Sequence, residues 1–589
     1  KQINQMKKTV SICCFILFLI FCSSRAGNKD SLTYTQAYNL NFRTGLHEQA
    51  VYPWMEHAAF APYSLAFAGE KDGKTYYTKK YFPGTPGMDR LKFEIMQRIA
   101  LPAHEPQEGR LTLVSKGENI EWIRITVRGI DKREEEKSRD TLRFMPGMEE
   151  EAHTLDFALG RSEILDIQIH AEGEKGKEAT IGLIEVRIKL GDTPLDAYPL
   201  RIPSDVPRPV RAIPVGNLRN FSPIGNKKIT ALGESLHYDK GVKSVAHELL
   251  YGMGEQGKAR LLLVEMPMEL ALLLDRYAQG GEVPDSVLVQ LAHHELAERL
   301  RSFNQGKKAT EKVHLSGVDY EYTTGSAQGT DISLFDFVVL ANREAKTLAA
   351  DQLAVLLMER QEWQKIVGFI DDNEEALSQV FTPDELACIR HILALSGKMG
   401  KDNIRRKTAR DSVMAINARF LIERFAPRLV DGVGIYAHAA HANMLSTYPA
   451  IPCKPFGAYM RRLYGDDYAS WLLLTDNPIQ PAPSHSVENS FRDTPSKLSY
   501  LSLTPAYDRL LFSRFEGASV SPQTFFLFNL YRRYDHILFI RQDAPVSERK
   551  RLTNKELMDR HIRVVKQRAS LLKELKMRIQ SETATPDLI

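Results

Sequence analysis

The chain has 589 residues, of which 43% are hydrophobic and 26% charged, and its formal net charge is +4. This length exceeds one ordinary hydrophobic core, so we predict two or three globular domains. A net charge this small gives no reason to expect nucleic acid or an acidic membrane surface as a partner.

The first predicted element is an export signal. Two lysines precede an apolar run that ends at Cys22 and is too short for a comfortable transmembrane helix. A small-x-small cleavage site ends at Ala26, so residues 1–26 are predicted to be a signal peptide. Lipid attachment at Cys22 is the alternative, although Phe21 is larger than the residue that usually precedes a lipidated cysteine. We therefore expect an exported protein, periplasmic or extracellular, without a transmembrane span.

Residues 27–202 are predicted to form an antiparallel β-sandwich of jelly-roll type. Runs such as RLTLVS, EWIRITVRG and ILDIQIHAEG alternate or are continuously apolar, and turn residues separate them. Modules of this kind bind carbohydrate in some families, which makes a glycan a candidate partner. Five aromatic side chains could stack on a sugar, although we favour the alternative that they fill the core or its rim: Trp54, Tyr63, Tyr76, Tyr77 and Tyr81.

A proline-rich segment, residues 203–217, is predicted to be a stiff linker. In residues 218–545, short apolar runs alternate with stretches of helical spacing. This alternation is typical of an α/β domain with a largely parallel sheet flanked by many helices. Ligand sites in such domains form beyond the carboxyl ends of the strands. Residues 546–589 are predicted to contain a charged, solvated helix at the edge of the domain rather than an element that binds a partner.

Three apolar runs of this domain end in acidic or imidazole side chains. Glu234 and His237 follow the first run, Glu265 ends the second, and His438 and His441 end the third. A single histidine in such a position is usually a hydrogen-bonded structural residue. In a parallel sheet, however, the three strand ends would converge on one rim. These residues therefore form a candidate active site.

Three chemistries fit these residues. Ser235 in GESLH imitates the nucleophile motif G-x-S-x-G, but His237 stands where the motif has its second glycine. A metal ion such as zinc is a second alternative, although the His438–His441 spacing is a loose ligand pattern. In the third, His237 is a general base that activates water, a glutamate orients it, and another histidine stabilises the oxyanion.

From about Ile229 to Gln542 the chain resembles the erythromycin esterase family. The matching motifs follow the family's order: GESLH, His247 in the next helix, LLLVEMP, GVDYEY, RDSVMAIN, YAHAAHAN, GAYMRRLYGDDY and YRRYDHILFI. The resemblance implies a hydrolase without metal or cofactor that opens a lactone, such as that of a macrolide, by attack of activated water. It implies His237 as the general base, Glu234, Glu265 and His438 as its active-site partners, and Arg410 and His441 as supporting, substrate-binding residues.

The chain departs from the family pattern beside the predicted pocket. Tyr238 replaces a glycine, Ala246 replaces a basic residue, and Tyr436 and Ala439 replace a tryptophan and an asparagine. We therefore expect an ester or lactone substrate other than the family's namesake drug. Tyr238 and Ala246 also favour an alternative, a non-catalytic protein that binds a ligand or glycan in the retained pocket.

Two residues near the site have structural alternatives. His247 is expected to pack inside its helix. Arg410 and Asp411 could pair with each other at a helix start, where the helix dipole favours an acid.

Overall fold

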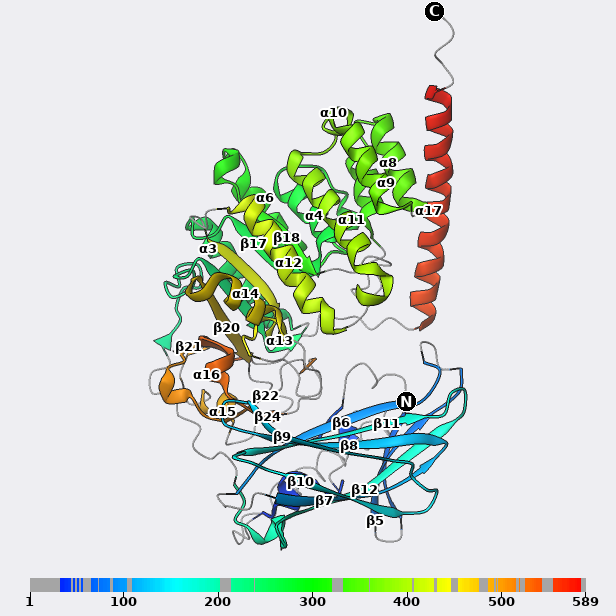
Figure 1. The fold of residues 1–589 in the computed structure, drawn as a ribbon. Coiled ribbons are helices and arrows are strands. Elements are labelled where there is room, and N and C mark those ends of the chain that lie inside the picture. The colour runs from blue at the N-terminus through cyan, green and yellow to red at the C-terminus, as the bar shows by residue number, and fades with distance from the viewer. Residues whose placement is uncertain are drawn as a thin grey trace, which may run out of the picture. The chain divides into compact units, whose positions relative to one another are not determined.

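The structure is a computed structural model, and it describes most of residues 32–583 (Figure 1). The predicted signal peptide, its alternative lipid anchor and most of the predicted linker lie outside the described residues, so they stay predictions. The residues outside the description are 1–31, 44–45, 48–49, 52–53, 57–64, 72–73, 85–87, 103–107, 202–212, 238, 320–331, 360, 405–406, 428–431, 446–453, 476–485, 492–493, 495, 515–517, 520–524, 543–553 and 584–589.

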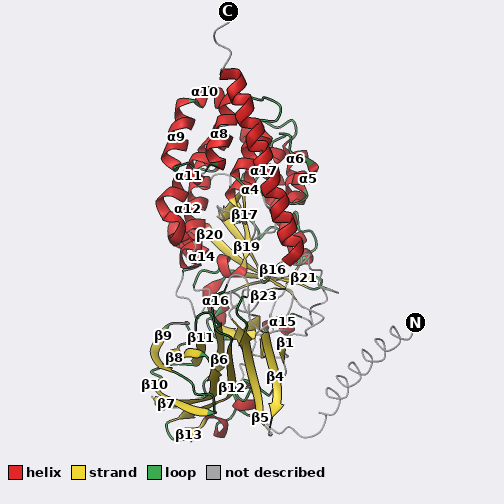
Figure 2. Cartoon of the chain, turned by 90° about the vertical axis from the view of Figure 1, so that its right-hand side faces the viewer, coloured by secondary structure: helices red, strands yellow, loops and turns green. Residues whose placement is uncertain are grey.

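The chain divides into two compact units. Unit 1 comprises Lys1–Gly129 and Glu136–Ile202, and unit 2 comprises Ile130–Glu135 and Pro203–Ile589. Figure 2 shows strands as the main element of unit 1 and a mixture of strands and helices in unit 2. Each unit is described separately below.

Unit 1 is an antiparallel β-sandwich, which confirms the predicted fold class for this part of the chain. One sheet has the order β10-β7-β12-β5-β4, with β13 beside β12, and the other has the order β3-β6-β11-β8-β9. The strands are β3 (Met55–Glu56), β4 (Leu65–Lys71), β5 (Lys74–Tyr81), β6 (Lys92–Ala100), β7 (Glu108–Glu118), β8 (Ile120–Ile130), β9 (Glu136–Phe144), β10 (Glu151–Ala158), β11 (Ile164–Gly173), β12 (Ala179–Leu190) and β13 (Thr193–Pro194).

The aromatic residues considered for sugar stacking mostly fill the core of the sandwich. Trp54, Tyr77 and Tyr81 are buried, so their rings are closed to a ligand. Tyr76 is partly exposed, but Lys116 Nζ lies 4.4 Å from its ring centroid and its hydroxyl donates to Glu150. The core alternative is confirmed for the three buried rings, and Tyr63 lies outside the described residues.

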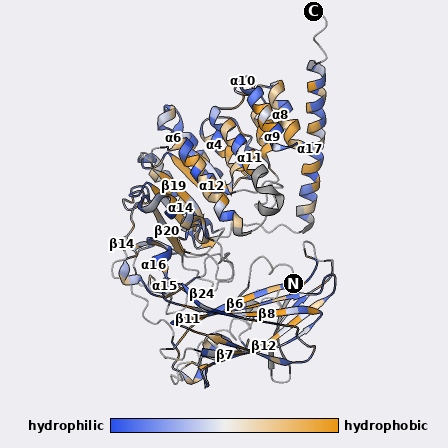
Figure 3. Cartoon of the chain, viewed as in Figure 1, coloured by the Kyte–Doolittle hydropathy of each residue, from blue (hydrophilic) through white to orange (hydrophobic). Residues whose placement is uncertain are grey.

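Unit 2 is built around an eight-stranded sheet with the order β14-β21-β25-β20-β15-β19-β17-β18. The strands from β25 to β18 are parallel, and β21 and β14 join one edge antiparallel, as predicted for a largely parallel sheet. Its central strands are buried along their whole length and are mostly apolar, because both faces of the sheet are covered (Figure 3). The strands are β14 (Ile213–Pro214), β15 (Ile229–Glu234), β17 (Leu261–Pro267), β18 (His314–Asp319), β19 (Val433–His438), β20 (Tyr468–Thr475), β21 (Leu498–Ser502) and β25 (His536–Ile540).

Helices connect and cover these strands, as the alternating pattern predicts. None of the helices in the described part of the chain is long and apolar enough to cross a membrane. The longer helices are α3 (Lys240–Glu255), α4 (Met268–Ala278), α6 (His294–Asn304), α7 (Leu334–Ala341), α8 (Leu348–Met358), α9 (Trp363–Asp372), α11 (Pro383–Ile404), α12 (Lys407–Phe425), α14 (Phe456–Tyr464) and α17 (Asn554–Thr583).

The C-terminal helix α17 is solvated on only part of its surface. Arg568 pairs with Asp336 of α7, and Arg578 pairs with Asp351 of α8. Leu575, between these arginines, is only 5% exposed. One side of α17 therefore packs against α7 and α8 and the other is exposed to solvent, which is the arrangement of a helix at the edge of a domain.

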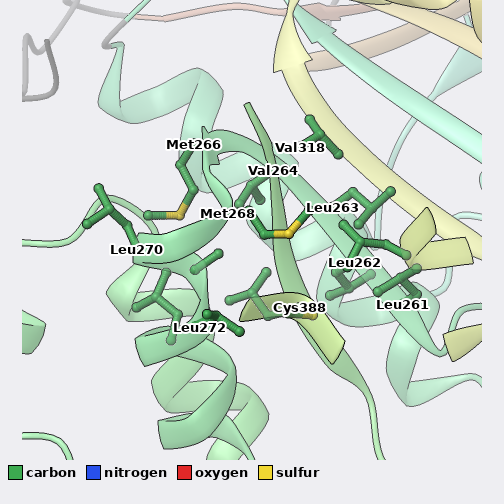
Figure 4. Close-up of a cluster of buried hydrophobic side chains, with 14 of the residues drawn as sticks. Leu261, Leu262, Leu263, Val264, Met266, Met268, Leu270, Leu272, Val318 and Cys388 are labelled. Atoms are coloured by element: carbon green, nitrogen blue, oxygen red, sulfur yellow. The ribbon is translucent and has the colours of Figure 1, made fainter. Parts of the chain in front are cut away.

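One apolar cluster fixes β17, the strand whose end carries Glu265. Four consecutive residues of β17 pack with side chains from α4, β18 and α11 (Figure 4). Cys388 of α11 lies among them as a free, buried thiol, and burial raises its pKa above the ordinary value. The labelled members of the cluster are Leu261, Leu262, Leu263, Val264, Met266, Met268, Leu270, Leu272, Val318 and Cys388.

Candidate active site

The acidic and imidazole residues predicted from sequence gather at the carboxyl ends of neighbouring parallel strands. Glu234 ends β15 and is in register with His438, which ends β19. Glu265 lies near the end of β17, the other neighbour of β19. Asp319 ends β18 at the edge of the sheet. The sheet therefore brings the three predicted strand ends to one rim, where ligand sites of α/β domains form.

Glu265 is the centre of the described site because it contacts three other candidate residues. Its Oε2 accepts the backbone N–H of His438 at 2.7 Å. Its Oε1 accepts from Arg410 Nη2 at 2.9 Å and lies 3.4 Å from His441 Nε2. The carboxylate is thus held in one orientation by donors from β19, α12 and the segment that follows β19.

Arg410 pairs with carboxylates from two strands and not with its neighbour in sequence. Its Nε donates to Asp319 Oδ1 at 3.1 Å, and its Nη2 donates to both Asp319 and Glu265. Desolvation lowers the pKa of Arg410, but attraction to Asp319 and Glu265 outweighs it and raises that pKa well above its ordinary value. The alternative in which Arg410 pairs with Asp411 is therefore wrong, and Arg410 is a fixed cation between β17 and β18.

His441 is a buried imidazolium held between two acids. Its Nδ1 lies 3.0 Å from both oxygens of Asp411, and Glu265 faces its Nε2. Burial lowers the pKa of His441, but Asp411 and Glu265 outweigh burial and raise it to about 10. Asp411 also accepts the backbone N–H of Phe456 at 2.7 Å, which ties the pair to the start of α14. At neutral pH, His441 is therefore a cation and a donor, and it is unsuited to act as a base.

His438 is held as a hydrogen-bond donor. It caps the short helix α13 (Ala439–Ala442), and its Nδ1 accepts the backbone N–H of Ala440 at 3.3 Å. An imidazole that accepts at Nδ1 carries its proton at Nε2 when neutral. This tautomer, assigned from the hydrogen bond, makes His438 Nε2 a donor toward developing negative charge.

Glu234 is buried at the end of β15 and accepts a hydrogen bond from the hydroxyl of Tyr436. Two further histidines lie edge-on to the Tyr436 ring. His247 of α3 is buried, as expected, and its Nε2 lies 2.9 Å from Nδ1 of His293. Burial lowers the pKa of His247 to about 3, so His247 is neutral at physiological pH.

His237 follows Glu234 on the short strand β16 (Leu236–His237), which pairs with β23 (Ala518–Ser519). The side chain of His237 and the neighbouring Tyr238 lie outside the described residues. Ser235, which directly follows Glu234, is 2% exposed, and its Oγ has no hydrogen-bond partner among the described residues. No described base therefore activates the hydroxyl of Ser235 for nucleophilic attack.

Small residues hold α13 directly against β15. A Cβ added to Gly233 would lie 2.8 Å from Cβ of Ala442 and 2.9 Å from Cα of Ala439. Real Cβ atoms essentially never come that close, so only glycine fits at residue 233. This contact sets the positions of His438 and His441, which lie at the start of α13 and within it.

The sequence does not predict the roles of four residues of this site. Asp319 lies in the motif GVDYEY without a predicted role, Asp411 is predicted only as an alternative partner of Arg410, and Tyr436 is only a departure from the family pattern. His293 had no signal, because its loop position before α6 carries no periodicity. No group of three or more His, Cys, Asp or Glu side chains in the described residues is arranged to hold a metal ion.

No protein-family model matches the chain, and no curated protein matches its sequence. Among solved structures, a Bacillus cereus protein is 16% identical with a TM-score of 0.43, over 58% of this chain and 97% of that one. A mutant of erythromycin esterase EreC in its open conformation is 14% identical with a TM-score of 0.36, over 56% and 94%. The carbohydrate-binding module TmCBM61, in complex with a galactotriose, is 14% identical with a TM-score of 0.20, over 27% and 99%. At such values, these similarities establish neither the family nor the activity of this chain.

Proposed function

We propose that the chain is an exported hydrolase that cleaves a carboxylic ester or lactone with water activated by His237. The observation that carries the proposal is the linked cluster of Glu265, Arg410, His441 and the backbone of His438 at the sheet rim. Such a cluster of paired, oriented charges at the carboxyl ends of parallel strands is typical of a catalytic centre. The resemblance to the erythromycin esterase family supports the same reaction.

The protonation states of the two described histidines support His237 as the base. His441 is already protonated at neutral pH, because Asp411 and Glu265 raise its pKa to about 10. His438 accepts a backbone N–H at Nδ1, so it is set up to donate from Nε2. A general base must be unprotonated near the working pH. Of the histidines that the strand-end motifs supply, His237 is left for that role.

In the proposed reaction, His237 takes a proton from water while the water oxygen bonds to the carbonyl carbon of the substrate. His438 donates from Nε2 to the resulting oxyanion. The carbonyl then re-forms, the carbon–oxygen bond to the alkoxide breaks, and His237 returns its proton to the leaving oxygen. Glu234 orients His237 and stabilises its imidazolium form.

Arg410 and His441 were expected to bind the substrate, but their contacts support a positioning role. Nε and Nη2 of Arg410 face Asp319 and Glu265, and the two ring nitrogens of His441 face Asp411 and Glu265. The two cations hold the carboxylate of Glu265 in one orientation, and Glu265 in turn fixes the backbone of His438. A metal-dependent reaction has less support, because both ring nitrogens of His441 already face carboxylates.

The proposal extends to location and partners. Export through residues 1–26 would release a mature protein to the periplasm or the medium, with lipid anchoring at Cys22 as the alternative. A small-molecule ester or lactone is the proposed substrate, and a glycan is the proposed partner of unit 1.

The test is hydrolysis of an ester and lactone panel that includes macrolides, with chelator present and absent. We expect turnover that chelator leaves unchanged and that His237→Ala lowers by about 10²–10⁴-fold, as for loss of a general base. His561→Ala, which removes an exposed histidine of α17, is the matched control and is expected to have no effect. Turnover lost with chelator would favour a metal enzyme. No turnover on any member would favour the binding-protein alternative.

A further inference from the structure

Tyr436 has no assigned role, yet it joins two strands at the candidate site. Its side chain is only 4% exposed. In register it lies beside Leu232 of β15 and Val264 of β17, two residues before His438 on its own strand. Its hydroxyl donates to Oε2 of Glu234. A phenol on β19 thus reaches the carboxylate that ends the neighbouring strand.

The ring of Tyr436 is held in place by two histidines. The ring of His247 lies 6.0 Å away at an interplanar angle of 79°, and the ring of His293 lies 5.7 Å away at 90°. His247 and His293 are also hydrogen bonded to each other at 2.9 Å. Because edge-on contacts come from α3 and from the residue before α6, the ring has little freedom to rotate. The position of the hydroxyl is therefore fixed relative to β15.

We propose that Tyr436 is a positioning residue that fixes the carboxylate of Glu234 through its hydroxyl. This inference rests on the proposed function, in which Glu234 orients His237. A hydrogen bond donated to a carboxylate favours its ionised form and restricts its orientation. Phenylalanine at this position would fill the same space but would lack the donor.

The hydroxyl of Tyr436 is one of several polar groups around Glu234. The ionisable side chains on the elements packed against β15 are His438 on β19, His441 on α13, Tyr468 on β20, and Lys240, Lys243, His247, Glu248, Tyr251 and Glu255 on α3. Tyr436→Phe leaves all of them in place. A change in the titration of Glu234 in that variant therefore reports on the phenol donor.

The control is Tyr468→Phe. Tyr468 is also a fully buried phenol of the same sheet, and its hydroxyl donates to the backbone carbonyl of Ala442 at 3.2 Å. Both variants lose one hydroxyl and one buried hydrogen bond, so a general loss of stability affects them alike. Thermal unfolding of both variants establishes that they fold.

The experiment measures the pKa of Glu234 by ¹³C NMR of glutamate-labelled protein, with the resonance assigned through Glu234→Gln. We expect Tyr436→Phe to raise the pKa of Glu234 by about 1, as for loss of a charge-assisted hydrogen bond, and Tyr468→Phe to leave it unchanged. On an ester that the parent hydrolyses, Tyr436→Phe is expected to lower kcat about 10-fold with KM within about twofold. An unchanged pKa in Tyr436→Phe overturns the inference.

The titration needs no substrate, so the two proposals fail separately. If the parent hydrolyses no ester, the proposed function fails, and the pKa of Glu234 still decides whether Tyr436 fixes that carboxylate. If the parent is active and both Phe variants lose activity equally, the phenol has only a packing role and the inference is overturned.

Discussion

The buried pair of His441 and Asp411 gives the most quantitative prediction. Asp411→Asn keeps an oxygen that can accept the Phe456 N–H but removes the negative charge beside His441. The rise in the pKa of His441 from 6.5 to about 10 corresponds to about 5 kcal/mol at 1.36 kcal/mol per pH unit. Asp411 shares this interaction with Glu265, so we expect the substitution to lower the free energy of unfolding by about 3 kcal/mol near pH 6.

The sign of the pH dependence follows from the direction of the shift. A histidine whose pKa is raised on folding stabilises the native state fully below its unfolded pKa of 6.5, and this contribution is lost as pH rises toward about 10. The difference between parent and Asp411→Asn should therefore be largest near pH 6 and smallest near pH 10.

The assay is urea unfolding at both pH values, followed by the fluorescence of Trp363 and Trp471, the two tryptophans of unit 2. Because the chain has two units, Trp54 and Trp122 of unit 1 are replaced by phenylalanine in parent and variant alike. A matched control in the same unit, Asp466→Asn at a fully exposed side chain, tests for general effects of removing one carboxylate. An equal difference between parent and Asp411→Asn at pH 6 and pH 10 would refute the account of His441 as a held cation.

The pairing of Arg410, the close approach at Gly233 and the docking of α17 can each be tested by substitution. Arg410→Lys loses the planar guanidinium that reaches both Asp319 and Glu265, so turnover should fall at least about 10-fold. The control Arg419→Lys, at an exposed position of α12, should have no effect on turnover. Equal activity of the two variants would contradict a role for the guanidinium of Arg410. Gly233→Ala forces a Cβ against Ala439 and Ala442 and should lower the free energy of unfolding, measured with urea, by about 1–3 kcal/mol. In the control Gly368→Ala nothing lies within 4 Å of the added Cβ, so the protein should not be destabilised. Leu575→Ala should lower the free energy of unfolding by about 2 kcal/mol or more, because Leu575 is buried. Met577→Ala, at an exposed side chain, should lower it by less than about 0.5 kcal/mol. Equal effects of the two substitutions would show that α17 does not dock on α7 and α8.

The parts of the fold that could be predicted from sequence are those with strong periodicity. The strands of unit 1 alternate, and β15, β17 and β19 are short apolar runs because they are buried in a parallel sheet. Strand ends of a parallel sheet share one edge, so Glu234, Glu265 and His438 could be grouped without a structure. The sequence could not provide the partners of these residues, which depend on tertiary contacts.

Arg410 and Asp411 show why the partners could not be predicted. They are consecutive residues of α12, and consecutive side chains on a helix do not face each other. Arg410 therefore reaches Asp319 and Glu265, and Asp411 reaches His441. The residues on which α17 docks could not be predicted for a related reason, because Arg568 pairs with Asp336, a residue 232 positions away in the chain.

The central claim, attack by water that His237 activates, is tested most directly by comparing His237→Ala and Ser235→Ala on one hydrolysed ester. These residues lie two positions apart, so local damage to β16 would affect both variants. The account predicts that kcat/KM falls by about 10²–10⁴-fold in His237→Ala and stays within about threefold of the parent in Ser235→Ala. Loss of turnover in Ser235→Ala, with an acyl adduct on Ser235 in the parent by mass spectrometry, would contradict it and identify a serine nucleophile.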